Sequence, residues 1–231
     1  MIRKVKGIIR NVNDLSPTAK ELVIDLEEPL PFVAGNFVNL FFPKDGETVR
    51  RAFSLSSSDA DSRTIALSVR RSRGMAGLTP YFWEHDVAGT PVELMGPLGE
   101  NTADKLTSKK AFLFAFGVGA GVIRSVADHL VKRASPPELR IMTGSRDDGD
   151  IIHKDYFDEL AAMGKAHVRY VVSTPGTSPF LSGYIQDHVS DFDFNDADVY
   201  MCGQDAACTE LQTKVLSTAP KNCRLFVESF G

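Results

Sequence analysis

Ala111-Phe112-Leu113-Phe114-Ala115-Phe116-Gly117-Val118-Gly119-Ala120-Gly121 is the stretch of sequence that decides the fold. Its first six residues form an almost continuous apolar run, which is typical of a strand buried on both faces of a parallel sheet. The alternate glycines that follow allow the backbone to approach a neighbour or a ligand closely. A helical pattern then runs over residues 122–133. Strand, glycine turn and helix in this order predict one unit of a parallel α/β sheet.

The same alternation continues to the end of the chain. Apolar runs predict further strands at residues 139–143, 167–173, 199–202 and 224–227. Helical patterns lie between them, at residues 151–163, 184–189 and 206–216. The second half of the chain is therefore expected to form a doubly wound parallel sheet.

The first hundred residues have the pattern of β structure instead. Short alternating runs at residues 5–12, 19–26, 37–42, 50–56, 64–70 and 92–95 are separated by turn residues such as Asp45-Gly46. Residues 79–85 predict one short helix among them. This pattern favours a six-stranded antiparallel barrel. The composition turns polar from Glu100 to Lys110, which divides the chain into a barrel domain at 1–103 and an α/β domain at 108–231.

Composition excludes several classes of protein. The 231 residues are 43% hydrophobic and 24% charged, as in an ordinary packed protein, and the net charge of -4 argues against nucleic acid as a partner. No apolar run is long enough to cross a bilayer, and no signal peptide pattern opens the chain. The three cysteines are too few for a disulfide framework or an iron–sulfur cluster, so we expect a cytoplasmic setting. The five histidines show no metal-ligand spacing, so no metal site is expected.

Arg51-Ala52-Phe53-Ser54 carries the first set of candidate binding residues. A guanidinium can fork onto a phosphate, an aromatic ring can pack on a heterocycle, and a hydroxyl can both donate and accept a hydrogen bond. The set therefore suits a ligand with an anionic part and a flat ring. Arg70-Arg71-Ser72-Arg73 follows a strand, and anion binding competes there with a simple solvated turn.

The glycine stretch carries the second set. The helix that follows Gly117-x-Gly119-x-Gly121 offers unpaired N–H groups and the positive end of its dipole, which suits a pyrophosphate. The spacing is not the Gly-x-Gly-x-x-Gly of ordinary dinucleotide folds. A tight packing turn is the alternative interpretation.

Taken together and in order, these motifs resemble the ferredoxin-NADP reductase superfamily, in which a flavin-binding barrel precedes a nicotinamide-binding α/β domain. The resemblance covers nearly all 231 residues. Arg51-Ala52-Phe53-Ser54 resembles the family's Arg-x-Tyr-Ser/Thr flavin motif. The resemblance implies that Arg51 meets a flavin phosphate, that Phe53 packs on the flavin, and that Ser54 hydrogen-bonds near flavin N5.

Further barrel segments extend the resemblance. Ser68-Val69-Arg70 is similar to the segment that lies along the rest of the flavin nucleotide. Gly77-Leu78-Thr79 resembles the phosphate site at a helix start, with one residue missing from the spacing. Residues 89–99 resemble the strand that closes the barrel.

The α/β half resembles the nicotinamide nucleotide domain of the family. Gly117-Val118-Gly119 is similar to the nucleotide loop, Ser145 and Arg146 to the segment that receives the adenosine ribose, and Cys202-Gly203 to the segment beside the nicotinamide. Glu228-Ser229-Phe230 resembles the terminus whose aromatic ring covers the flavin. The resemblance implies catalytic positions for Ser54, Cys202 and Phe230. Three residues depart from the family pattern: Val118 for Thr, Val122 for Pro and Gln204 for Pro.

The resemblance implies an NAD(P)H-dependent flavin oxidoreductase. FAD takes a hydride from NAD(P)H, and the electrons go to a separate acceptor such as ferredoxin, flavodoxin or a partner subunit. One alternative is an NAD(P)H:flavin reductase that uses free flavin as substrate. Another is a non-catalytic or regulatory subunit, which the three departures favour. The choices of NADH or NADPH, of FAD or FMN, of acceptor and of oligomeric state stay open. Arg146 suits a 2′-phosphate, whereas Asp147 and Asp148 oppose one.

Overall fold

The structure, a computed structural model, describes residues 1–72, 77–174 and 178–230. Arg73 of the arginine cluster and the terminal Gly231 lie outside the described residues. Within these ranges, no helix has both the length and the apolar character needed to span a membrane.

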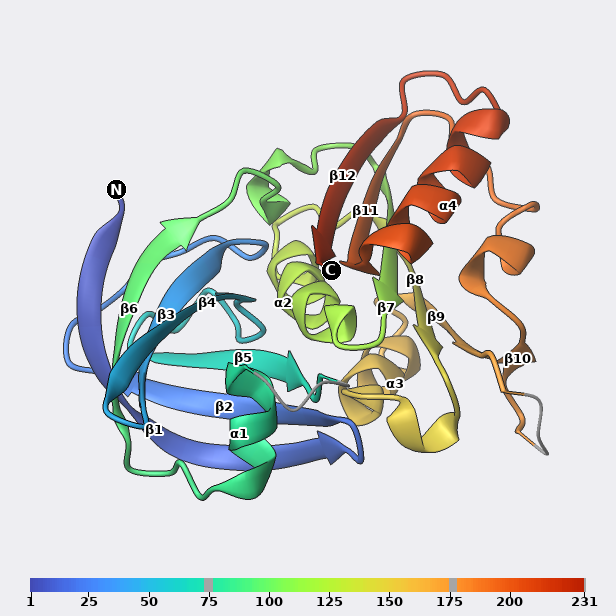
Figure 1. The fold of residues 1–231 in the computed structure, drawn as a ribbon. Coiled ribbons are helices and arrows are strands. Elements are labelled where there is room, and N and C mark those ends of the chain that lie inside the picture. The colour runs from blue at the N-terminus through green and yellow to red at the C-terminus, as the bar shows by residue number, and fades with distance from the viewer. Residues whose placement is uncertain (73–76, 175–177, 231) are drawn as a thin grey trace.

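The first half of the chain forms the expected antiparallel barrel (Figure 1). Its six strands are hydrogen-bonded in the order β4-β3-β6-β1-β2-β5, and a bridge between Leu55 and Leu67 connects the two ends of the sheet. The elements are β1 (Arg3–Ser16), β2 (Ala19–Leu26), β3 (Phe37–Lys44), β4 (Glu47–Ser54), β5 (Thr64–Arg70), the short helix α1 (Leu78–Glu84) and β6 (Pro91–Leu98).

Alternation of side chains along the strands builds the core of the barrel. In β1 the buried positions are Val5, Gly7 and Ile9, and their neighbours face outward. Phe42 of β3 packs edge-on against Phe82 of α1, which places the helix against the end of the barrel. The interior of the barrel is therefore filled with side chains, and a ligand must bind on the outer surface of the barrel or at its rim.

The second half forms the expected parallel sheet, in the order β10-β9-β8-β7-β11-β12. Helices α2 and α3 pack on one face, and α4 with the 3₁₀ turn η3 packs on the other. The elements are η1 (Ala103–Lys105), β7 (Lys110–Phe116), α2 (Gly119–Val131), β8 (Glu138–Ser145), η2 (Asp148–Asp150), α3 (Lys154–Ala162), β9 (His167–Val172), β10 (Leu181–Ser182), η3 (Ile185–His188), β11 (Ala197–Gln204), α4 (Asp205–Ser217) and β12 (Arg224–Phe230).

Some boundaries differ from the sequence-based expectation. The helix expected from residue 151 begins only at Lys154, because η2 and an extended link occupy the preceding residues. The helix expected at residues 184–189 is the 3₁₀ turn η3, and the two-residue strand β10 was not expected. Helix α2 begins at Gly119, inside the glycine stretch rather than after it.

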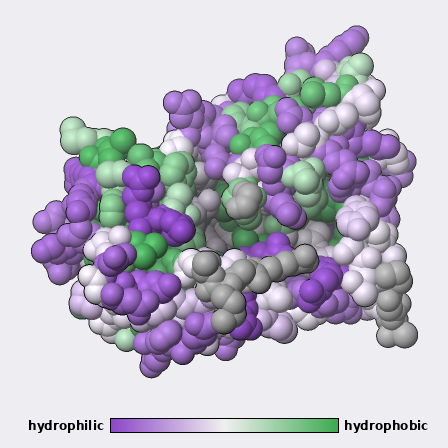
Figure 2. Space-filling view, viewed as in Figure 1, coloured by the Kyte–Doolittle hydropathy of each residue, from purple (hydrophilic) through white to green (hydrophobic). Residues whose placement is uncertain are grey.

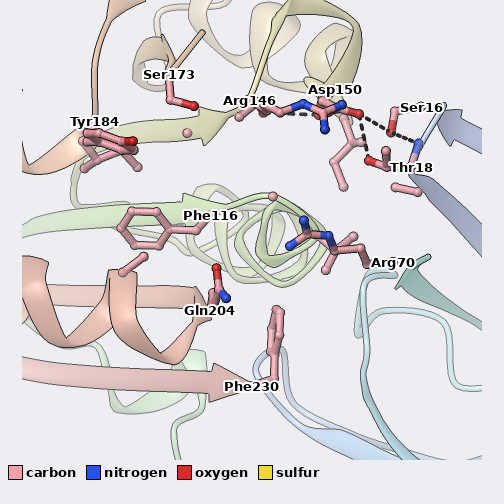
Figure 3. A pocket seen from close by; sticks show the side chains of 18 of the residues that line it. Ser16, Thr18, Arg70, Phe116, Arg146, Asp150, Ser173, Tyr184, Gln204 and Phe230 are labelled. Atoms are coloured by element: carbon pink, nitrogen blue, oxygen red, sulfur yellow. Dashed lines mark hydrogen bonds and ion pairs between the residues drawn. The ribbon is translucent and has the colours of Figure 1, made fainter. Parts of the chain in front are cut away.

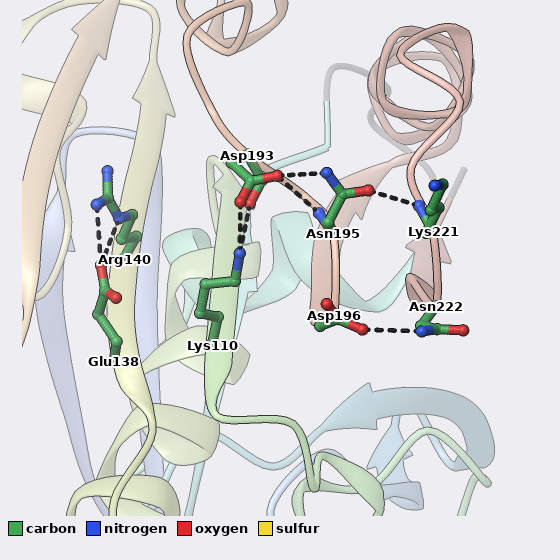
Figure 4. Close-up of polar contacts among 8 residues, drawn as sticks. All are labelled: Lys110, Glu138, Arg140, Asp193, Asn195, Asp196, Lys221 and Asn222. Atoms are coloured by element: carbon green, nitrogen blue, oxygen red, sulfur yellow. Dashed lines mark hydrogen bonds and ion pairs between the residues drawn. The ribbon is translucent and has the colours of Figure 1, made fainter.

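Polar side chains fix the edge of the sheet where the parallel strands begin (Figure 4). Lys110, the first residue of β7, donates a 2.8 Å hydrogen bond to Asp193, and Asp193 also accepts from Asn195. Asn222 donates to Asp196, which joins the turns that precede β11 and β12. The opposite edge, where the strands end, faces the barrel.

The barrel and the α/β unit are joined along helix α2. Arg124 pairs with Glu21 of β2 at 3.1 Å, and Ser125 Oγ donates to the backbone oxygen of Ser57 at 2.6 Å. His129 Nδ1 lies 2.6 Å from an Asp59 carboxylate oxygen. These contacts seat α2 between the two units, so that the glycine stretch at its start lies beside the barrel.

Candidate functional site

Two cavities lie where the barrel meets the strand ends of the α/β unit, and Figure 2 shows the surface hollowed there. The larger has a volume of about 830 Å³ and is lined mainly by the barrel, with contributions from α2 and β12. The smaller, of about 210 Å³, is lined mainly by the α/β unit. Four residues line both cavities: Arg70, Val118, Gln204 and Phe230. A ligand in one cavity would therefore touch a ligand in the other at this junction.

The residues of the expected flavin motif line the larger cavity. Arg51, Ala52, Phe53 and Ser54 come to it from β4, and Ser68, Val69 and Arg70 come from β5. Arg51 is exposed, and one of its guanidinium nitrogens donates to the backbone oxygen of Arg50. Phe53 is half-buried against the barrel core. A cation, an aromatic ring and several hydroxyls thus surround one space large enough for a nucleotide.

A buried hydroxyl in this cavity lacks a partner. Ser56 is 1% exposed, lines the cavity, and its Oγ has no hydrogen-bond partner among the described residues. A buried hydroxyl left unpaired costs about 1–3 kcal/mol, so native sites supply a partner. A flavin, which has polar ring edges and a hydroxylated chain, fits this cavity because it can supply that partner.

The glycine stretch serves packing as well as binding. A Cβ at Gly119 would lie 2.1 Å from the backbone oxygen of Cys202, and a Cβ at Gly121 would lie 2.3 Å from Ser68 Oγ. These two glycines therefore let α2 approach β11 and the barrel. Gly117, with φ of 55°, is the glycine that faces open space. It lines the smaller cavity together with Val118, whose side chain does not cap the helix.

The segment at the end of β8 that was expected to bind the ribose lines the smaller cavity (Figure 3). Ser145 and Arg146 line it, and Arg146 is paired with Asp147 at 3.3 Å and with Asp150 at 3.2 Å. Asp150 also accepts a 2.8 Å hydrogen bond from Thr18 of the β1–β2 turn. The cavity is thus built by both halves of the chain.

Strand β12 contributes an aromatic ring, Phe230, and a carboxyl group, Glu228, to the cavity walls. Phe230 lines both cavities, and Figure 3 shows its ring pointing into the space between Gln204 and Arg70. Glu228 lines the larger cavity, and its burial raises the pKa of the carboxyl above the usual range, partly offset by a hydrogen bond from Asn101. The site therefore contains a carboxyl with an increased tendency to hold a proton.

Five expected residues lie away from both cavity walls, among them Gly119, which packs against the backbone oxygen of Cys202. Cys202 is 0% exposed, and burial raises the pKa of its thiol well above the usual range, so the group is a buried thiol and not a thiolate. Gly203 follows it in β11, with φ of 154°, and a Cβ there would lie 2.5 Å from Cβ of Phe116. Gly77 caps α1 without a side chain, and Leu78 is buried in the barrel core, so only Thr79 of that segment lines the larger cavity.

Several residues that line the cavities were not expected from the sequence. Ser56, Val122 and Gln204 line the larger one, although Val122 and Gln204 were noted only as departures from a motif. Ser16, Thr18 and Asp150 line the smaller one. The only local signal for these three was a polar turn, because their meeting depends on how the two halves pack. Among the described residues, no group of acidic, His or Cys side chains is arranged to hold a metal ion.

Models of two protein domains match the chain. An oxidoreductase FAD-binding domain matches residues 6–102, and an oxidoreductase NAD-binding domain matches residues 113–212. The two matches fall on the barrel and on the parallel sheet respectively. The chain therefore contains an FAD-binding domain followed by an NAD-binding domain.

Two curated proteins are similar over most of the chain. Ferredoxin–NADP reductase B of Sorangium cellulosum is 32% identical over 183 residues, which cover 77% of this chain and 74% of that protein. The reductase component of phenol 2-monooxygenase from Pseudomonas sp. strain CF600 is 30% identical over 222 residues, which cover 91% of this chain and 62% of that protein. The chain thus spans about three fifths of the length of this second relative.

A solved structure has the same fold. The FAD/NAD-binding domain of nitric oxide dioxygenase from Vibrio cholerae superposes with a TM-score of 0.86 at 18% identity, over 98% of both chains. A barrel followed by a parallel sheet, in this relative arrangement, is therefore the architecture of both.

Proposed function

The chain belongs to the ferredoxin-NADP reductase family, and from this premise we propose that it transfers a hydride from NAD(P)H to bound FAD and passes the electrons to a separate acceptor. The observation that supports this best is the pair of cavities that meet at Arg70, Val118, Gln204 and Phe230. Hydride transfer needs two rings in contact, and two nucleotide cavities that share a wall provide this.

In this proposal the larger cavity holds FAD. Arg51 binds a phosphate, Phe53 packs on the flavin ring, and Ser54 and Ser56 hydrogen-bond to its polar atoms. A bound flavin supplies the redox chemistry, since it accepts a hydride and can release electrons one at a time. The protein supplies orientation. Val118 and Gln204 line both cavities at the junction, and in this proposal the Phe230 ring occupies the position that the nicotinamide ring must take.

The smaller cavity holds the rest of the nicotinamide nucleotide. Gly117 and Val118 at the start of α2 take the pyrophosphate, and Ser145 and Arg146 at the end of β8 take the adenosine ribose. In this proposal Cys202 is a positioning residue: its thiol is buried, and its backbone oxygen packs against Gly119 at the start of α2.

The acceptor in the proposal is a redox protein. One relative is by name a ferredoxin–NADP reductase and another the reductase component of a monooxygenase.

We place the domain boundary between residues 103 and 108, and the family matches, which end at 102 and begin at 113, support this. A cytoplasmic setting completes the proposal, since all three cysteines are free thiols.

An anaerobic assay tests the proposal. The flavin content of purified protein is measured first, and FAD is added to one equivalent if needed. NADH or NADPH is then added while the flavin absorbance is followed. Bleaching with either nucleotide, followed by electron delivery to an added ferredoxin or flavodoxin, is the expected result.

Other results separate the alternatives. A colourless protein that reduces many equivalents of added flavin would instead be a flavin reductase that uses flavin as substrate. Absence of bleaching with both nucleotides, in protein shown to contain FAD, would overturn the enzymatic proposal and favour a non-catalytic subunit.

A further inference from the structure

We propose that Ser125 and His129 of helix α2 are positioning residues for the flavin, because they fix the barrel loop at residues 56–59, whose first residue is Ser56. This role rests on the proposed function, in which the larger cavity holds FAD. Both residues line neither cavity, and both belong to the α/β unit and not to the FAD-binding barrel. Figure 1 shows α2 lying between the barrel and the parallel sheet.

The loop at residues 56–59 lies between β4 and β5, just after the bridge residue Leu55. The barrel holds the start of this loop. The amide of Ser56 donates to the backbone oxygen of Ala66 at 2.8 Å, and the hydroxyl of Ser57 accepts from the amide of Ala66 at 3.1 Å. Ser56 Oγ is the buried hydroxyl that lines the larger cavity with no partner in the described chain. Its direction depends on how the backbone on both sides of it is held.

Helix α2 holds the rest of the loop. Ser125 Oγ donates to the backbone oxygen of Ser57 at 2.6 Å, and His129 Nδ1 lies 2.6 Å from a carboxylate oxygen of Asp59. Because a carboxylate accepts hydrogen bonds, Nδ1 is the donor in this contact. The same Asp59 oxygen accepts from the backbone amide of Ala34 at 3.1 Å. This carboxylate therefore joins α2 to the barrel at the end of the loop.

The spacing along α2 explains why these contacts fall on neighbouring loop residues. Gly121, Ser125 and His129 are each four residues apart, so they lie on one face of the helix. A Cβ at Gly121 would lie 2.8 Å from Cβ of Ser56, which shows how closely this face approaches the loop. The face thus follows the loop from its first residue to its last, and a shift of the loop along it would move the Ser56 hydroxyl.

Burial makes these two contacts stronger than an ordinary surface pair. Ser125 is 0% exposed, and the side chains of His129 and Asp59 are 24% and 14% exposed. Loss of the Ser125 hydroxyl would leave a backbone oxygen without its donor, and loss of the imidazole would take a donor from a charged acceptor. By contrast, Lys132 donates to Ser58 Oγ at 3.2 Å from a side chain that is 55% exposed and also paired within α2, so it contributes little.

Titration of the flavin-free full chain with FAD, followed by flavin fluorescence, tests this role. Ser125→Ala and His129→Leu should each weaken FAD binding about fivefold, since each frees one end of the loop. His129→Asn keeps an N–H donor close to the position of Nδ1, and should bind FAD within about twofold of the natural chain. Unchanged affinity in Ser125→Ala and in His129→Leu would overturn the proposal. A loss in His129→Asn as large as in His129→Leu would overturn the role of the His129 donor.

A double-mutant cycle with Ser56→Ala separates positioning from a general loosening of the fold. If Ser125 and His129 act through the Ser56 hydroxyl, their replacement should weaken FAD binding by less than about a further twofold once that hydroxyl is absent. Losses that multiply in full would show that the two residues act independently of Ser56, and would overturn the proposal.

Glu21→Gln is the matched control. It removes the partner of Arg124, whose 3.1 Å contact joins the same helix to β2 of the barrel without involving the loop at residues 56–59. FAD affinity should change by less than about twofold, although the chain loses a contact between its two units. A loss as large as that of His129→Leu would show that any weakening of this boundary lowers the affinity, and would overturn the assignment to the loop.

Circular dichroism establishes that each variant is folded before the titration. If His129→Leu does not fold, Asp59→Asn replaces it in the test. This change keeps an acceptor for the Ala34 amide but removes the charge that strengthens the contact with His129, so FAD affinity should fall about threefold. Unchanged affinity in Asp59→Asn and in Ser125→Ala would overturn the proposal and leave the proposed function standing. Failure of the natural chain to bind FAD would count against the proposed function itself.

Discussion

At the scale of single residues, the hydroxyl of Ser56 has opposite consequences in the free and the flavin-bound protein. It is almost fully buried, and it has no partner among the described residues. In the free protein it therefore destabilises the fold, whereas a ligand that hydrogen-bonds to it gains affinity. A buried polar group whose partner is missing thus marks a binding site without any appeal to a motif.

Ser56→Ala should separate these two effects. We expect the flavin-free variant to be as stable as the natural chain or about 1 kcal/mol more stable, because an unsatisfied hydroxyl is removed. Its affinity for FAD should fall about fivefold to tenfold, the equivalent of one lost hydrogen bond. Urea unfolding and fluorescence titration with FAD measure the two quantities.

Thr143→Val is the matched control for this prediction. Thr143 is also buried, and its hydroxyl has no partner in the described part of the chain, but it lines neither cavity. Its replacement should leave the affinity for FAD unchanged within about twofold, since no contact with the ligand is lost. If Ser56→Ala leaves flavin affinity as unchanged as Thr143→Val does, the flavin does not contact Ser56.

Phe230 leads to a second prediction at this scale. Its side chain is 37% exposed and stands at the junction of the two cavities. A ring in this place must leave before a nicotinamide can stack there, so Phe230→Ser should increase the apparent affinity for the nucleotide or change the rate of flavin reduction, by about fivefold or more. Stopped-flow reduction at several nucleotide concentrations measures both. Identical traces for variant and natural chain would refute a covering role.

At the scale of elements, the start of α3 connects the two halves of the molecule. His153 is the N-cap of α3 and has a left-handed backbone, with φ of 56°. Its Nε2 lies 3.2 Å from Ser68 Oγ, and Ser68 lines the larger cavity. Burial, with a smaller contribution from the charge of Arg124, lowers the pKa of His153 to about 3. The imidazole is therefore neutral at ordinary pH.

This pKa predicts how stability depends on pH. A histidine whose pKa is about 3 when folded and 6.5 when unfolded binds a proton mainly in the unfolded state between these values. The free energy of unfolding should therefore fall as the pH drops from about 6.5 toward 3, by up to about 1.4 kcal/mol per pH unit. His153→Asn retains a residue that tolerates left-handed backbone and does not titrate.

Urea unfolding of both proteins at several pH values between 4 and 7 tests this prediction. The stability of the natural chain relative to His153→Asn should decline steadily as the pH falls below about 6.5. A difference that does not vary with pH would show that the histidine is not held neutral by burial.

The elements also show how far sequence can predict this structure. The antiparallel barrel and the doubly wound parallel sheet were predicted and are confirmed. The barrel follows from alternating apolar residues, and the parallel sheet follows from continuous apolar runs that alternate with helical patterns. The two-residue strand β10 and the 3₁₀ turn η2 were missed, because segments this short have no period to detect. Residues 184–189 were expected as part of a helix, and the structure forms the 3₁₀ turn η3 there.

The candidate site divides in the same way. Arg51, Ser54, Arg146 and Phe230 lie within recognisable strings, and all four line a cavity. Thr18 and Asp150 are 132 positions apart and meet only because the units pack along α2. The glycine stretch was interpreted as a nucleotide loop or a packing turn, and the structure gives Gly119 and Gly121 packing contacts while Gly117 faces open space.

At the scale of the whole molecule, the larger cavity belongs to both units. Ser54 and Ser68 line it from the barrel, whereas Val122 of α2 and Glu228 of β12 line it from the α/β unit. The ion pair between Arg124 and Glu21 joins the same two units. Flavin binding should therefore stabilise α2 and β12 as well as the barrel, although the barrel contains the Arg-Ala-Phe-Ser motif.

A ligand that binds the folded state alone adds about 2.7 kcal/mol of stability at a concentration one hundred times its Kd. Because the cavity crosses the boundary between the two units, we expect the whole chain to unfold in a single transition whose midpoint rises when FAD is added.

Hydrogen exchange tests the same prediction element by element. Backbone amides of α2 and β12, like those of β4 and β5, should exchange more slowly when FAD is added. Glu21→Gln, which removes the partner of Arg124, should reduce the protection of α2 more than that of β4. Protection confined to the barrel strands, or a transition that splits so that only one part shifts with FAD, would mean that the α/β unit contributes nothing to holding the flavin. The junction at Val118, Gln204 and Phe230 would then have to form only when the nicotinamide nucleotide arrives.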